Sequence, residues 1–129
     1  MAVAASALRA QQARMRIIAE NIANADSTAR TPGGDPYRRS MPIFEPQNVE
    51  GGGRGVRMVR SAPDPAAFRS IYSPGHPGAN AQGYVNMPNV DPLMEALDMR
   101  QAQRAYEANL SVIDNARAMD MRTLDLLRR

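Results

Sequence analysis

Residues 1–25 read MAVAASALRAQQARMRIIAENIANA and decide the fold, because they form a long segment without a helix-breaking residue. All ten prolines and all nine glycines of the 129-residue chain lie between Pro32 and Pro92, and these two residue types are the least favourable in a helix interior. The sequence therefore predicts an α+β chain. A helix lies in residues 1–31, a small β-rich and loop-rich region in 32–92, and a second helix in 93–129.

Apolar residues in the first segment recur at alternating spacings of three and four, which is typical of a coiled-coil seam. The predicted seam positions are Met1, Ala4, Leu8, Gln11, Met15, Ile18, Ile22 and Ala25. Charged residues, including Arg9, Arg16 and Glu20, lie on the other faces. We therefore expect this helix to pack along one narrow stripe.

The second helix has a clear start signal, because Asp91 can cap its N-terminus and Pro92 suits the first helical position. Its predicted seam positions are Ala102, Ala105, Asn109, Val112, Ala116, Met119, Thr123 and Leu126. Asn109 is either a polar residue that sets the register or a solvated one, and the spacing favours neither. We predict that the two helices pair as an antiparallel coiled coil, and that their remaining apolar surface becomes ordered on assembly with partners.

The middle region contains three strand-like segments, at residues 37–44, 55–61 and 68–72. The glycine-rich stretch 51–55 between the first two predicts a loose hairpin tip, since neither a Lys nor a Ser/Thr follows it as a phosphate-binding loop requires. Residues 73–92 are dense in turn-forming residues and predict an irregular return to the second helix.

Composition argues against most chemical functions. The chain has no Cys and a single histidine, His76, so we predict no disulfide, no metal site, no cofactor and no enzyme. All sixteen basic residues are Arg, but they are dispersed and the net charge is only +3, so an Arg-rich nucleic-acid binder is the weaker alternative. We expect neither a cleaved signal peptide nor direct membrane insertion.

Three collinear stretches resemble the flagellar rod and hook (axial) protein family, and together they span nearly the whole chain. They are IIAENIANADSTARTPGGDPYRR (17–39), PGHPGANAQGYVNMPNV (74–90) and AQRAYEANLSVIDNARAM (102–119). The first contains Ala23, Asn24 and Thr28, which resemble the asparagine-rich turn that ends the family's N-terminal helix. The second is the most specific, and it is most similar to proximal-rod members. Members of the family usually begin several residues before the position of Met1, so we expect this start to be short.

The resemblance implies a structural subunit of the bacterial flagellar basal-body proximal rod, which spans the periplasm. It implies export of the unfolded chain by the flagellar type III export apparatus, and helical self-assembly through the terminal helices into a torque-transmitting shaft around the export channel. The implied partners are the rod proteins FlgB, FlgF and FlgG, a rod-base adaptor and components of the MS ring. Another axial component such as FlgB is the alternative identity.

The predicted assembly interface combines seam residues, residues on the family motifs and the Tyr37–Arg39 cluster. An aromatic residue beside two arginines is typical of an interface, although an ordinary strand start with exposed Arg fits the composition equally well. The predicted interface residues are Leu8, Met15, Ile18, Asn21, Ile22, Asn24, Tyr37, Arg38, Arg39, Arg104, Tyr106, Asn109, Val112, Met119 and Leu126.

Overall fold

The computed structural model describes residues 2–128 and has two helices and two separate two-stranded antiparallel sheets. The elements follow the order α1 (Ala2–Ala23), β1 (Ser40–Asn48), β2 (Arg54–Pro63), β3 (Arg69–Tyr72), β4 (Tyr84–Met87) and α2 (Pro92–Leu127). The α+β prediction is therefore confirmed. All four strands lie between the two helices in the sequence, as the distribution of proline and glycine predicts.

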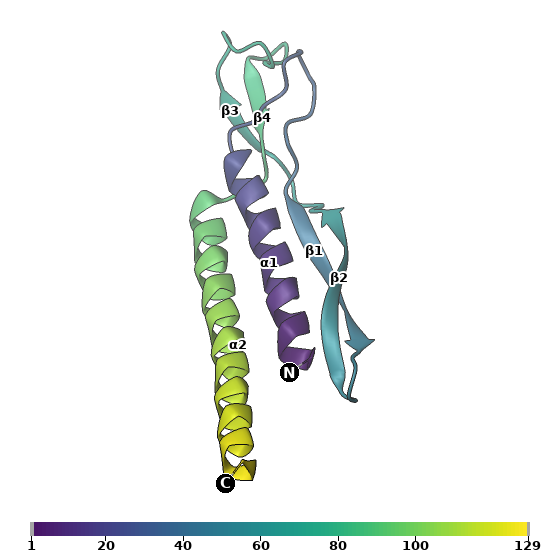
Figure 1. Ribbon diagram of the computed structural model, residues 1–129. Coiled ribbons are helices and arrows are strands. Elements are labelled where there is room, and N and C mark those ends of the chain that lie inside the picture. Colours follow the sequence, from purple (N-terminus) through teal and green to yellow (C-terminus); the bar gives the residue numbers. More distant parts are fainter. Residues whose placement is uncertain (1, 129) are drawn as a thin grey trace.

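The two helices lie side by side and run in opposite directions, with α1 between α2 and the β1–β2 hairpin (Figure 1). The β3–β4 sheet lies at the far end, beyond the C-terminus of α1 (Figure 1). The molecule is thus elongated, and most of its interior lies along α1. Its hydrophobic core is thin, because the buried apolar residues are mainly Ala, Val and Ile.

Helix α1 differs from its predicted pattern, since it is buried on more than one narrow stripe. Ala4 and Ile18 of the predicted seam are buried, but Ile22 is 38% exposed and Ser6 and Asn21, outside the seam, are buried. The reason is that α1 has a second partner: the Ser6 hydroxyl accepts a hydrogen bond from the Val56 amide of β2 at 3.1 Å. The helix also ends at Ala23, before the predicted boundary at residue 31.

Helix α2 begins as predicted, because Asp91 caps it by accepting hydrogen bonds from the amides of Leu93 and Met94. It has 36 residues against 22 in α1, so it is longer by roughly 20 Å at 1.5 Å per residue. Figure 1 shows its C-terminal part extending past the start of α1. Residues 117–128 are all exposed.

The predicted seam of α2 faces inward over only part of its length. Ala102 is buried and Ala105, Asn109 and Ala116 are half-buried, whereas Val112, Met119 and Leu126 are 55%, 66% and 69% exposed. Tyr106 and Ile113, beside the predicted seam, are also half-buried. The inner face is therefore wider than the predicted seam, and the last seam positions lie within residues 117–128, which are all exposed.

The β1–β2 hairpin confirms the predicted glycine-rich tip, and Gly51, Gly52 and Gly53 all have positive φ angles. A register shift between Ile43 and Phe44 interrupts the ladder. Gly55 permits the close approach of β2 to α1, because a Cβ there would lie 2.3 Å from the Ser6 hydroxyl oxygen. The contact between the hairpin and α1 therefore depends on one small residue.

The second sheet contains a strand that the sequence analysis missed. The predicted strand at 68–72 is present as β3, but it pairs with β4, which lies inside the passage expected to be irregular. Tyr72 lies opposite Tyr84, and their rings meet edge to face with centroids 5.4 Å apart. Strand β4 has only four residues and lies among turn-forming residues, so its sequence has no recognisable strand pattern.

Candidate assembly interface

The guanidinium of Arg39, just before β1, forms ion pairs with three carboxylates. It forms an ion pair with Glu95 in the first turns of α2, a second with Asp64 at 3.1 Å, and a longer one with Asp98 at 4.0 Å. The backbone amide of Arg39 also donates to the Asn89 side chain at 2.7 Å. These contacts join the start of β1, the end of β2 and the start of α2.

The electrostatics of this cluster follow from its burial. The side chain of Glu95 is only 2% exposed, whereas that of Arg39 is 24% exposed. Burial lowers the pKa of Arg39, but hydrogen bonds and charge from Glu95 and then Asp64 outweigh it and raise that pKa above its ordinary value. The Ala66 amide, and after it Arg39, hold the pKa of Asp64 below its ordinary value. Both groups are therefore charged at neutral pH.

One oxygen of the buried carboxylate lacks a partner. Within residues 2–128, Oε2 of Glu95 accepts no hydrogen bond, and all its pairing is through Oε1 to Arg39. An uncompensated buried charge is strongly destabilising, so Glu95 depends on Arg39 for its stability in this position.

A second polar contact fixes the C-terminal end of α1. The buried Asn21 side chain accepts hydrogen bonds from the Tyr37 hydroxyl at 2.7 Å and from the Ser40 amide at 2.9 Å, and it donates to the Ser40 carbonyl at 2.9 Å. Three of the four hydrogen bonds that this amide group can make are thus formed inside the chain. Asn21 attaches the helix to the start of β1.

Arg38 and His76 complete the contacts at this end of the molecule. Arg38 donates to the Asp64 carbonyl at 2.7 Å, and its guanidinium lies 4.2 Å from the centroid of the Phe68 ring. Nδ1 of His76 accepts from the Gly78 amide at 2.9 Å, so Nε2 carries the proton toward the Thr28 hydroxyl at 3.0 Å. His76 therefore joins the turn before β4 to the loop after α1.

The structure brings together four predicted interface residues, Asn21, Tyr37, Arg38 and Arg39, but through contacts within one chain. Sequence analysis missed their partners Glu95 and Asp64. Glu95 resembles a residue placed to favour the helix dipole, and Asp64 resembles a turn residue before proline. Arg39 and these two carboxylates carry opposite charges, but they are far apart in sequence, and nothing local indicates that they pair.

The other predicted interface residues divide by exposure. Ile18 is buried, and the half-buried ones are Leu8, Met15, Asn24, Tyr106 and Asn109. The amide of Asn109 donates to the Ala105 carbonyl of its own helix at 2.8 Å. The exposed ones are Ile22, Arg104, Val112, Met119 and Leu126.

Helix α2 carries an unusual amount of exposed apolar side chain. The exposed large apolar residues on it are Leu93, Met94, Leu97, Leu110, Val112, Met119, Met121, Leu124, Leu126 and Leu127. A concentration of large exposed apolar side chains is typical of protein–protein contact surfaces. The geometry therefore favours α2 as the element that meets other subunits.

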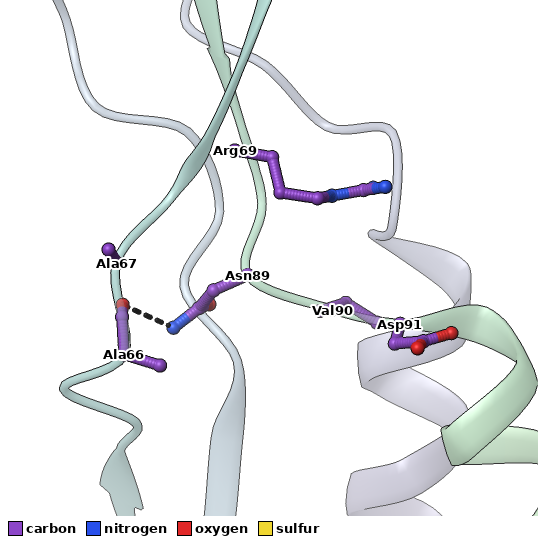
Figure 2. A pocket seen from close by; sticks show the side chains of 6 residues that line it. All are labelled: Ala66, Ala67, Arg69, Asn89, Val90 and Asp91. Carbon is purple, nitrogen blue, oxygen red and sulfur yellow. Dashed lines mark hydrogen bonds between the residues drawn. The ribbon is translucent and has the colours of Figure 1, made fainter.

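Figure 2 shows a shallow hollow lined by Ala66, Ala67, Arg69, Asn89, Val90 and Asp91, in which the Asn89 amide donates to the Ala66 carbonyl at 3.0 Å. Within residues 2–128, no group of three or more His, Asp or Glu side chains is placed to hold a metal ion. Neither described helix combines the length and apolar character needed to cross a membrane.

Comparisons with known proteins agree with this geometry. A family model described as "Flagella basal body rod protein" matches residues 1–30, and one described as "Flagellar basal body rod FlgEFG protein C-terminal" matches residues 81–126. The first matched segment contains α1, and the second contains all of α2 except its last residue; these are the helices that pair in the structure.

Curated relatives cover nearly the full chain. The chain is 47% identical to "Flagellar basal-body rod protein FlgC" of Agrobacterium fabrum, over 98% of this chain and 91% of the relative. It is 39% identical to proteins of the same name from an Escherichia coli strain and from Bacillus subtilis, in each case over 96% of this chain. Those two alignments cover 92% and 93% of the relatives.

Proposed function

The chain belongs to the FlgC family of flagellar basal-body rod proteins, and from this premise we propose that it assembles into the proximal rod through the outer faces of α2. The chain is a structural subunit of the flagellar basal body, and the basal-body rod is where it acts. The observation that carries the proposal is the exposed apolar surface of α2, which has no partner among residues 2–128. A rod subunit needs such surfaces on several sides because each copy must contact more than one neighbour.

In this proposal the helices of neighbouring subunits complete a coiled-coil layer around the export channel, in which α1 and α2 are antiparallel partners. The support is the seven-residue spacing of exposed Val112, Met119 and Leu126, which places them along one side of α2. Packing of many such helices makes a stiff shaft that transmits torque. The middle region, with the Arg39 cluster, holds the β-sheets at a fixed position relative to the helices.

The same proposal includes the partners of the assembled rod. Other rod proteins such as FlgB, FlgF and FlgG, a rod-base adaptor and the MS ring are the expected neighbours, and the type III apparatus is the expected export route. The thin core supports delivery in an unfolded state, because little buried surface has to be broken before export. Tyr37, Arg38 and Arg39 then act chiefly by shaping the subunit rather than by direct contact with neighbours.

The test compares an exposed seam residue with a buried one. Val112→Asp should leave the circular dichroism and melting temperature of the isolated chain unchanged but abolish rod assembly and swimming, because Val112 is 55% exposed and available to a partner. Ile18→Asp should impair both folding and assembly, because Ile18 is 4% exposed and its replacement buries a charge.

The matched control is Asn48→Asp, at an exposed position of β1. It introduces the same carboxylate away from α2, and we expect normal rods and normal swimming. Normal rods in the Val112→Asp strain would refute the proposal that this face of α2 enters the assembly.

A further inference from the structure

Two pairs of exposed charges in this chain have matching spacing and opposite sign. Arg9 and Arg16 are exposed on α1, seven residues apart, and Glu107 and Asp114 are exposed on α2, also seven residues apart. Seven residues are close to two helical turns, so each pair lies on one face with a separation of roughly 10 Å. The ion pairs found within residues 2–128 all use Arg39, which leaves these four charges without an internal partner.

We propose that Arg9 and Arg16 of one copy bind Asp114 and Glu107 of a second copy, so that α1 of one subunit docks on the outer face of α2 of the next. This inference rests on the proposed function and names the partner surface for one side of α2. Its occupant is a second copy of this chain, because charge sign and spacing are complementary between the two helices. The charges set register, and exposed Leu110 between the two acids supplies apolar contact.

The direction of the contact follows from the fold. Within one chain α1 and α2 are antiparallel (Figure 1), so copies that point the same way along a rod bring α1 of one against α2 of the next in antiparallel fashion. Arg9 is then level with Asp114, and Arg16 is level with Glu107. The same register places Gln12 level with Ser111.

Such a contact joins two different surfaces, α1 on one copy and α2 on the other. Contacts of this head-to-tail type leave a free surface at each end of the pair and so continue from copy to copy. The small side chains Ala5 and Ala19, near the two arginines on α1, permit close approach of a second helix. The docking mode therefore extends an assembly and does not close it as a dimer.

A disulfide cross-link reports this register directly, since the chain has no Cys of its own. One copy carries Gln12→Cys and a co-expressed copy carries Ser111→Cys, in a bacterium that lacks its own FlgC, and basal bodies are isolated and oxidised. A covalent dimer that requires both variants is expected. Dimers formed by Gln12→Cys alone, or swimming cells with no dimer, would overturn the docking mode while leaving the rod function intact.

Cross-linking within one chain cannot occur, because each copy carries a single cysteine. The pairing of the helices within one chain also has a different register: the Arg14 guanidinium donates to the Gln101 side chain at 3.2 Å, which places Gln12 beside residue 103 of its own α2. Ser111 lies roughly 12 Å farther along that helix.

Charge reversal, made in the cysteine-bearing copies, gives a second test. Arg9→Glu/Arg16→Glu should lower dimer yield and swimming roughly tenfold through repulsion of like charges, and Glu107→Arg/Asp114→Arg should do the same. The four changes combined in one chain should restore both. The control Arg54→Glu/Arg60→Glu, with the same change of charge at exposed positions of β2, should have no effect. Failure of the combined variant to restore swimming and dimer yield would refute the proposed ion pairs.

Discussion

Replacing Arg39 with methionine tests the role of the buried ion-pair cluster most directly. Methionine keeps the apolar stem but removes the charge that pairs with Glu95, whose side chain is 2% exposed and whose Oε2 already lacks a partner. Breaking a buried pair from one side costs about 3–5 kcal/mol. The pairs with Asp64 and Asp98 are more exposed and contribute at most about 1 kcal/mol each. We expect Arg39→Met to lower the free energy of unfolding by about 3–4 kcal/mol.

The same geometry predicts an asymmetry between the two partners. Glu95→Gln keeps the shape of the side chain and an oxygen that can accept from Arg39, and Arg39 retains Asp64, so we expect a loss of only about 1–2 kcal/mol. In Arg39→Met/Glu95→Gln no buried charge is stranded, so the loss should be smaller than the sum of the two single losses.

Urea unfolding followed by circular dichroism at neutral pH measures all three values. The control is Arg57→Met, which removes an exposed arginine of β2 and should change stability by less than about 0.5 kcal/mol. If Arg39→Met costs no more than this control, or no more than Glu95→Gln, the reasoning about a stranded buried carboxylate is wrong.

Three further predictions concern the same end of the molecule. Gly78→Ala should destabilise the chain by about 1–3 kcal/mol, because the new Cβ would lie 2.5 Å from a backbone oxygen, whereas Gly75→Ala, with open space around it, should be neutral in the same thermal melts. Asn21→Ala should cost about 2–3 kcal/mol in urea unfolding, since it leaves the Tyr37 hydroxyl and buried backbone groups without their partner; a loss equal to that of Tyr37→Phe alone would contradict this. The pKa of Asp64 is lower in the folded chain than in the unfolded one, so its stabilisation is complete above the unfolded value and is lost as pH falls below about 4. Urea unfolding at decreasing pH should show this loss, and Asp64→Asn should flatten the dependence.

The sequence was sufficient to predict the elements that depend on local signals. The start of α2 follows from Asp91 and Pro92, and the hairpin tip follows from three consecutive glycines with positive φ. Strand β4 was missed because a four-residue strand among turn residues has no local signature, and it exists through pairing with β3.

The sequence predicted both helices, but it predicted less well which of their faces are buried. A seam periodicity shows neither how wide the buried face is nor where along the helix it ends: Ile113, beside the predicted seam of α2, is half-buried, whereas Val112 on the seam is exposed. Predicting that α1 is buried on two sides would have required knowing that β2 packs against it. The cluster around Arg39 required the tertiary fold, since Glu95 and Asp64 are distant from it in sequence.

The position of Arg39 also bears on how accurately a long assembly can repeat. One side chain connects the start of β1 to α2, the helix that we propose contacts neighbours, and so restricts the angle between these two parts. In a helical stack a small angular error in each copy accumulates along the axis, and a loosely hinged subunit would produce a bent tube. The ion pairs of Arg39, repeated in each copy, would therefore limit how far the proposed assembly can bend.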